Sequence, residues 1–218
     1  TTAGKGTVPS DHAHVWGYKL GHPQVQEALQ KSDCILAVGT ELSETDFWNG
    51  RLRLNAPIIR IDIDADALVR PHAATLPILA DATTTMKSVA DQFGSEVPCH
   101  ATAPRSDDDD LRRTLTQVLG VIRDSLPDDT VVASDMTQIA YAANEIFPVS
   151  KPRTWLHPVG FGTLGFALPA AIGAKFGVGK TPVAALAGDY GLQYTLNELG
   201  TAVEHKLPIP ILLWNNTA

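Results

Sequence analysis

The sequence predicts an α/β protein made of two partial, doubly wound (Rossmann-like) domains, each a parallel sheet flanked by helices. Continuous apolar runs of strand length alternate with segments of helical periodicity, which is typical of parallel sheets covered on both faces. Between them, residues 94–110 combine Gly, Pro and Ser with four consecutive aspartates. We therefore predict a partial first domain over 1–93, a solvated linker over 94–110 and a second domain over 111–218.

In the first domain we expect a helix over 23–31, which begins at a proline, and buried strands over 34–39 and 57–63. A second helix is expected over 82–93. The aspartate run 107–110 could also bind a metal, but adjacent carboxylates on a flexible segment point in different directions, so a solvated role is favoured.

The second domain shows a clearer alternation of elements. Helices are expected over 111–124, 137–146, 164–176 and 192–206, and strands over 130–133, 155–156, 182–187 and 209–214. Pro169 should bend or loosen the third of these helices.

Composition and charge limit the possible functions. The 218 residues carry a net charge of −7, with 44% hydrophobic and 19% charged residues. With no basic cluster, nucleic acid is not an expected partner, and no apolar run approaches the ~18 residues of a membrane span. The two cysteines, Cys34 and Cys99, form no CxxC pattern, which favours a reduced, cytoplasmic setting.

Polar residues follow two strands near the end of the chain. Gly188, Asp189, Tyr190 and Gly191 follow one strand, and Asn216 follows the next. In a right-handed βαβ unit both ends lie at the carboxyl edge of one sheet, where open α/β sheets bind ligands. A carboxylate and an amide oxygen suit Mg²⁺ or Ca²⁺, and the free N–H groups that start a helix suit a phosphate. Each fragment alone also reads as an ordinary turn.

A second motif, Gly160, Gly162 and Gly165, spells G-x-G-x-x-G before a helix. It could be a dinucleotide fingerprint with Asp189 on the ribose. Against this, His157 and Pro158 interrupt the strand that should lead into the first glycine, and the asparagines would be left unexplained.

The runs GFGTLGFALPAAIGAKFG (160–177) and LAGDYGLQYTLNELGTAVEHKLPIPILLWNN (186–216) resemble the cofactor-binding domain of thiamine diphosphate enzymes. SDMTQIAYAANEIF and KPRTWLHP (134–158) resemble the opening of that domain. GKGTVPSDHAHVWG, ILAVGTEL and IIRIDIDADAL (4–68) resemble the second half of the family's middle domain. The most similar group is the acetolactate synthase-like 2-oxo acid decarboxylases and carboligases.

The resemblance implies a role for each matching residue. Asp189, Asn216 and the backbone carbonyl of Ala218 would bind Mg²⁺, which bridges the cofactor's diphosphate. Gln138 and the N–H groups near Gly188, Tyr190 and Gly191 would hold phosphate oxygens. The backbone at Gly162 and Leu164 would bind the aminopyrimidine. Leu164 would also be the apolar wedge between the two rings, although it could be a core leucine, and Gln138 could be a solvated helix residue.

The implied activity is decarboxylation or carboligation of a 2-oxo acid, in which the thiazolium accepts the electrons released when CO₂ leaves. The family's catalytic glutamate lies on a separate domain that we do not find in this chain. We therefore expect a fragment that is truncated at its C-terminus and inactive alone, and a homodimer or homotetramer in the full-length protein.

Two alternatives remain. One is an FAD-containing acetolactate synthase, which the acidic turn Thr40–Asp46, without arginine, disfavours. The other is a non-catalytic nucleotide-binding α/β module. Asp62 and Asp64 end a strand and could reach a ribose, although capping is the favoured role.

Overall fold

The computed structural model describes residues 1–47, 52, 54–93 and 110–216, and the chain divides into two compact units. The N-terminal unit is formed by Thr1 and Lys19–Pro104. The C-terminal unit is formed by Arg105–Ala218 together with Thr2–Tyr18. No helix in the described ranges has the length and apolar character needed to cross a membrane.

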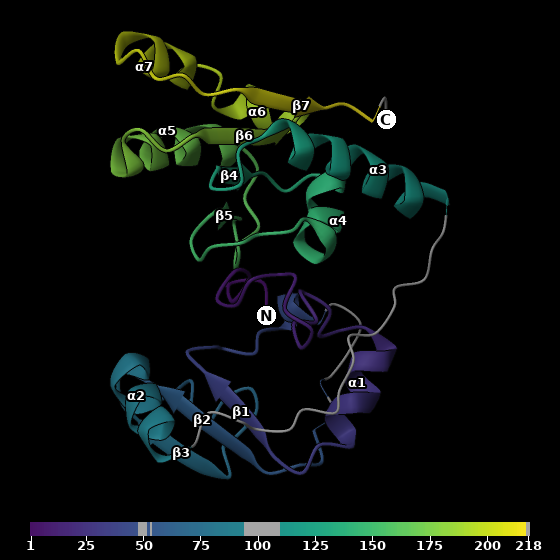
Figure 1. Ribbon diagram of the computed structural model, residues 1–218, viewed down its shortest axis with the longest axis vertical. Coiled ribbons are helices and arrows are strands. Elements are labelled where there is room, and N and C mark those ends of the chain that lie inside the picture. Colours follow the sequence, from purple (N-terminus) through teal and green to yellow (C-terminus); the bar gives the residue numbers. More distant parts are fainter. Residues whose placement is uncertain (48–51, 53, 94–109, 217–218) are drawn as a thin grey trace. The chain divides into compact units, whose positions relative to one another are not determined.

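The N-terminal unit contains a parallel sheet of β1, β2 and β3 in that order (Figure 1). Its elements, in chain order, are α1 (Pro23–Gln30), β1 (Ile35–Val38), the 3₁₀ turn η1 (Glu44–Asp46), β2 (Ile58–Asp62), β3 (Leu76–Leu79) and α2 (Ala82–Gln92). Proline at the start of α1 and Asp81 before α2 explain where these helices begin. The Asp81 carboxylate accepts a 2.9 Å hydrogen bond from the Thr84 N–H.

The C-terminal unit is built on a parallel sheet in the order β5-β4-β6-β7 (Figure 1). Its elements are α3 (Asp110–Ser125), β4 (Val131–Ser134), α4 (Gln138–Ile146), β5 (Trp155–Leu156), α5 (Ala167–Val178), β6 (Val183–Gly188), α6 (Asp189–Tyr194), α7 (Glu198–Glu204) and β7 (Ile211–Trp214).

The two central strands of this sheet are buried on both faces, as their uninterrupted apolar runs require. Val132 and Leu186 pack with residues of α3 and α4 on one face. Val131, Ala133 and Ala185 pack with α5 on the other. All residues of β4 and β6 are buried, so the side chains on both faces of these strands lie in the interior.

Within the C-terminal unit, residues 2–18 pack against the segment that follows the linker. The Ser10 N–H donates to the Val149 carbonyl (2.9 Å), and the Val149 N–H donates to the Ser10 hydroxyl (3.0 Å). The Lys5 ammonium donates to the Asn144 carbonyl at 3.0 Å and lies 5.7 Å from the centre of the Trp155 ring. These contacts attach the first residues of the chain to α4 and to the loop before β5.

The fold class is confirmed, and three local expectations were wrong. The single helix expected over 192–206 is two helices, α6 and α7, with a turn between Tyr194 and Glu198. The helix expected from residue 164 begins at Ala167, so Pro169 lies in its first turn and removes no internal hydrogen bond. Strand β3 was not predicted, because it contains a proline and is largely exposed.

The expected linker 94–110 falls almost entirely outside the described residues, and Asp110 is the first residue of α3.

Candidate thiamine diphosphate and metal site

The carboxyl edge of the C-terminal sheet gathers the polar residues singled out in the sequence. Gly188 at the end of β6 pairs with Trp214 at the end of β7. Asp189 follows the first of these strands directly, and Asn216 stands two residues beyond the second. Both residues therefore leave neighbouring parallel strands at the same edge of the sheet.

Asp189 and Asn216 offer oxygen atoms of the kind that Mg²⁺ prefers. Asp189 is half-buried, and within the described ranges its carboxylate takes part in no hydrogen bond or ion pair. Asn216 is exposed. Ala218, the third expected ligand, lies outside the described residues. The described residues contain no cluster of three or more His, Cys, Asp and Glu that could hold a metal, so a Mg²⁺ at Asp189 would also need amide, backbone and ligand oxygens.

Because Gly188 and Gly191 carry no side chain, the end of β6 and the start of α6 can approach the turn that follows β4. A Cβ added to Gly188 would lie 2.9 Å from the Thr137 hydroxyl oxygen. One added to Gly191 would lie 2.1 Å from Oδ2 of Asp135, which is closer than real Cβ atoms come. The backbone at both glycines must therefore lie against these neighbours.

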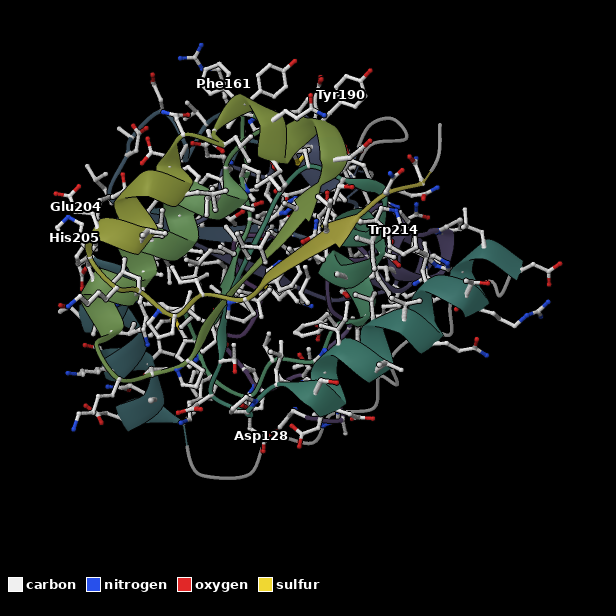
Figure 2. The ribbon with its side chains drawn as sticks, turned by 90° about the horizontal axis from the view of Figure 1, so that it is seen from above. Asp128, Phe161, Tyr190, Glu204, His205 and Trp214 are labelled. Carbon is white, nitrogen blue, oxygen red and sulfur yellow. The ribbon has the colours of Figure 1, made fainter. Side chains whose placement is uncertain are left out.

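Gln138 is the first residue of α4, and its side chain reaches the end of β7. The Trp214 indole N–H donates to its Oε1 at 3.2 Å. Figure 2 shows Trp214 on β7, whereas Tyr190 of α6 projects outward and is 65% exposed. Tyr190 thus contributes its backbone to this edge and leaves its ring accessible.

The glycine-rich loop between β5 and α5 contains three residues in the left-handed region. Gly160, Gly162 and Gly165 have φ of 87°, 62° and 84°. A Cβ on Gly162 would meet the Met136 methyl carbon at 2.8 Å. Phe161 is fully exposed and points outward (Figure 2). Leu164 is 43% exposed, so the loop carries two apolar side chains that are accessible at the surface. Leu164 is therefore no core leucine of this unit.

Two family models match this chain. Residues 135–218 match "Thiamine pyrophosphate enzyme, C-terminal TPP binding domain", and residues 1–89 match "Thiamine pyrophosphate enzyme, central domain". The chain belongs to the thiamine pyrophosphate enzyme family. The family expected from the sequence is thus confirmed.

Relatives of this chain carry decarboxylase and synthase names. It is similar to the "probable 2-ketoarginine decarboxylase AruI" of Pseudomonas aeruginosa, with 38% identity over 100% of this chain and 41% of the relative. It is 32% identical to the acetolactate synthase of Mycobacterium avium, over 99% of this chain and 38% of the relative. The chain therefore spans about two fifths of the length of these relatives.

A solved structure has the same fold. The thiamine diphosphate-dependent 4-hydroxybenzoylformate decarboxylase of Rhodococcus jostii superposes with a TM-score of 0.73 at 23% identity. The match covers 95% of this chain and 40% of that one. At this identity the likeness supports the α/β architecture.

Sequence reasoning missed a polar group at the same edge of the sheet in the C-terminal unit. Asp135 is buried, and its carboxylate accepts hydrogen bonds from the N–H groups of Met136, Gly165 and Phe166. The only signal in the sequence was an aspartate directly after an apolar strand, which a helix cap would also produce.

His157 was also missed as part of a network. Its Nδ1 lies 2.8 Å from the Ser134 hydroxyl, and its Nε2 lies 3.0 Å from Nδ2 of Asn144, whose Oδ1 accepts from the Trp155 indole at 2.9 Å. Burial lowers the pKa of His157 to about 4. The imidazole is therefore neutral at physiological pH.

In the N-terminal unit, Asp62 and Asp64 have the predicted capping role. Each carboxylate accepts a hydrogen bond from the N–H two residues further on, at 3.0 and 2.9 Å respectively. Both carboxylates are used within the turn after β2.

Proposed function

We propose that this chain supplies the half-site that binds the diphosphate and Mg²⁺ in a thiamine diphosphate-dependent enzyme acting on a 2-oxo acid. One observation carries the proposal: Asp189 and Asn216 follow strands β6 and β7, whose last residues, Gly188 and Trp214, are paired. Ala218 would add a backbone carbonyl to the metal.

The residues fit such a cofactor chemically. Carboxylate and amide oxygens are hard ligands, as Mg²⁺ requires. Tyr190 and Gly191 lie in the first turn of α6. The first N–H groups of a helix have no acceptor within the helix, so these two would be donors to phosphate oxygens. Gln138 would donate from its amide nitrogen to the same phosphates.

The glycine-rich loop would hold the other end of the cofactor. The backbone at Gly162 and Leu164 would bind the aminopyrimidine, and the exposed Leu164 side chain is available as the wedge between the two rings. The bound cofactor supplies a thiazolium that accepts electrons from the bond broken when CO₂ leaves. The residues of this chain bind and orient it and keep its metal in place.

The reaction we propose is decarboxylation or carboligation in a homo-oligomer in the cytoplasm. The first substrate to test is 2-ketoarginine, because the relative with 38% identity carries that name. Acetolactate synthase activity is the second candidate, because relatives with that name are also similar to the chain. A yellow colour of the purified intact protein would favour the flavin-containing form of that candidate.

Calorimetric titration of the intact protein with thiamine diphosphate tests the proposal. We expect binding that is saturable and much weaker when Mg²⁺ is removed by a chelator. CO₂ release from a panel of 2-oxo acids then identifies the substrate. An intact, folded protein that fails to bind thiamine diphosphate in Mg²⁺ would contradict the proposal.

A further inference from the structure

Asp135 is a buried carboxylate whose partners are backbone N–H groups. Its side chain is 1% exposed. The Gly165 N–H lies 3.0 Å from both carboxylate oxygens, the Met136 N–H 3.0 Å from Oδ1, and the Phe166 N–H 3.3 Å from Oδ1. Over the described part of the chain Asp135 forms no ion pair. A buried carboxylate with neutral partners is expensive unless its oxygens are well satisfied, so this arrangement is a specific one.

The same carboxylate touches the helix that follows β6. A Cβ on Gly191 would overlap Oδ2 of Asp135, and one on Gly165 would lie 3.1 Å from the Tyr194 Cβ and 3.4 Å from the Gly191 carbonyl oxygen. Asp135, the end of the glycine-rich loop and α6 therefore meet at one junction. The contact between Asp135 and α6 requires a glycine at position 191, and a side chain at Gly165 would press against α6.

The other end of the loop is attached to Ser134, the last residue of β4 and the neighbour of Asp135. The Trp155 indole can only donate, so it fixes Oδ1 of Asn144 as acceptor and turns Nδ2 toward His157. Nε2 of His157 then accepts, and the proton on Nδ1 is donated to Ser134. Ser134 and Asp135 thus hold both ends of the loop that carries Gly162 and Leu164.

We propose that Asp135 is a positioning residue that sets the spacing between this loop and α6. If the proposed function holds, on which this inference rests, the loop binds the aminopyrimidine end of the cofactor and α6 the diphosphate end. Asp135 would then match the separation of the two half-sites to the length of thiamine diphosphate. A simple cap of α5 would not require contact with Gly191. The exposed Asp81, which caps α2, has the simple role.

The test compares two ligands. Pyrophosphate needs only the proposed diphosphate and metal half-site (α6, Gln138, Asn216 and the Mg²⁺), whereas thiamine diphosphate needs both half-sites at the correct spacing. Each is titrated calorimetrically with Mg²⁺ into the intact wild-type protein, Asp135→Asn and the matched control Asp81→Asn. We expect Asp135→Asn to weaken thiamine diphosphate about 10-fold or more and pyrophosphate less than about 3-fold. The control should change neither. Equal losses for both ligands, or no loss, would overturn the proposal.

A measurement on the wild-type protein decides the matter if Asp135→Asn does not fold. Magnesium pyrophosphate bound at α6 should slow hydrogen exchange of the Gly165 and Phe166 amides through Asp135, and leave the Thr84 amide at Asp81 unchanged. Unaltered exchange at Gly165 and Phe166 with ligand bound would refute the coupling. If the wild-type protein binds neither ligand, the proposed function itself fails, and the inference falls with it.

Discussion

The indole N–H of Trp214, the last residue of β7, donates a 3.2 Å hydrogen bond to Oε1 of Gln138, the first residue of α4. An indole nitrogen can only donate, so the Gln138 amide must present its oxygen to Trp214 and keep its two N–H groups for another acceptor. This bond holds a hydrogen-bond donor at the edge of the sheet where we propose the diphosphate binds.

Gln138→Glu should therefore impair cofactor binding without impairing the fold. Glutamate retains an oxygen for Trp214 but replaces the amide N–H groups with a negatively charged oxygen that repels phosphate. We expect the affinity for thiamine diphosphate to fall about 10- to 100-fold, the range for a hydrogen bond to a charged group. Calorimetry measures this change. Gln92→Glu, at an exposed position of the N-terminal unit, makes the same change of charge and should bind normally.

Asp189→Asn should uncouple cofactor binding from Mg²⁺. The substitution keeps the shape of the side chain but removes the charge that attracts the metal. We expect the affinity for thiamine diphosphate in Mg²⁺ to fall toward the value measured with a chelator. The exposed Asp128 (Figure 2) provides a control, since Asp128→Asn should retain the full response to Mg²⁺. A variant at residue 189 that still gains affinity from Mg²⁺ as the wild type does would remove Asp189 from the proposed metal site.

The elements that the sequence predicted well are those whose burial is nearly complete. Strands β4 and β6 lie between helices on both faces, so selection for apolar residues is continuous and visible in the sequence. Strand β3 contains Pro77 and is mostly exposed, so neither apolar continuity nor propensity marks it. The break between α6 and α7 depends on turn geometry rather than on polarity, and the helical periodicity on either side concealed it.

The candidate site divides in the same way. Asp189 and Asn216 could be predicted to share an edge because each follows a strand, and parallel strands end together. Asp135 follows a strand too, but its partners Gly165 and Gly191 are 30 and 56 residues away along the chain. Contacts of this kind depend on the packing of three elements, which no local pattern encodes.

The stability of the C-terminal unit should depend on pH through His157. Burial lowers the folded-state pKa of His157 to about 4, below the ordinary value of 6.5. The unfolded chain then binds more protons than the folded one between these values, so stability is complete above about pH 6.5 and declines as the pH falls toward 4. We expect a loss of about 2 kcal/mol, since each unit of pKa corresponds to about 1.4 kcal/mol and partial exposure reduces the effect.

Urea denaturation at several pH values measures this dependence. In His157→Gln the slope between pH 4 and 6.5 should flatten, because glutamine does not titrate. The corresponding change at the exposed His205 should leave the slope as it is in the wild type. A slope unaffected by substitution of His157 would assign the pH dependence to other groups.

Arg60 provides the last prediction, in the N-terminal unit. This β2 residue is 1% exposed, and its guanidinium donates to the carbonyl oxygens of Thr40, Arg70 and His72 at 2.6, 3.1 and 2.8 Å. Burial lowers the pKa of Arg60. The group joins the turn after β1 to the loop between β2 and β3, with hydrogen bonds in three directions.

Arg60→Lys should destabilise this unit although the charge is kept. An ammonium cannot reproduce the planar fork, so at least one of the three carbonyl oxygens would lose its donor and the buried positive charge would have fewer acceptors. We expect the free energy of unfolding to fall by about 2–4 kcal/mol, because each unsatisfied buried group costs about 1–3 kcal/mol. The control is Arg70→Lys, whose side chain pairs with Asp66 at the surface and should change stability by less than about 1 kcal/mol. Similar urea midpoints for the two variants would show that the buried fork of Arg60 does not stabilise the unit.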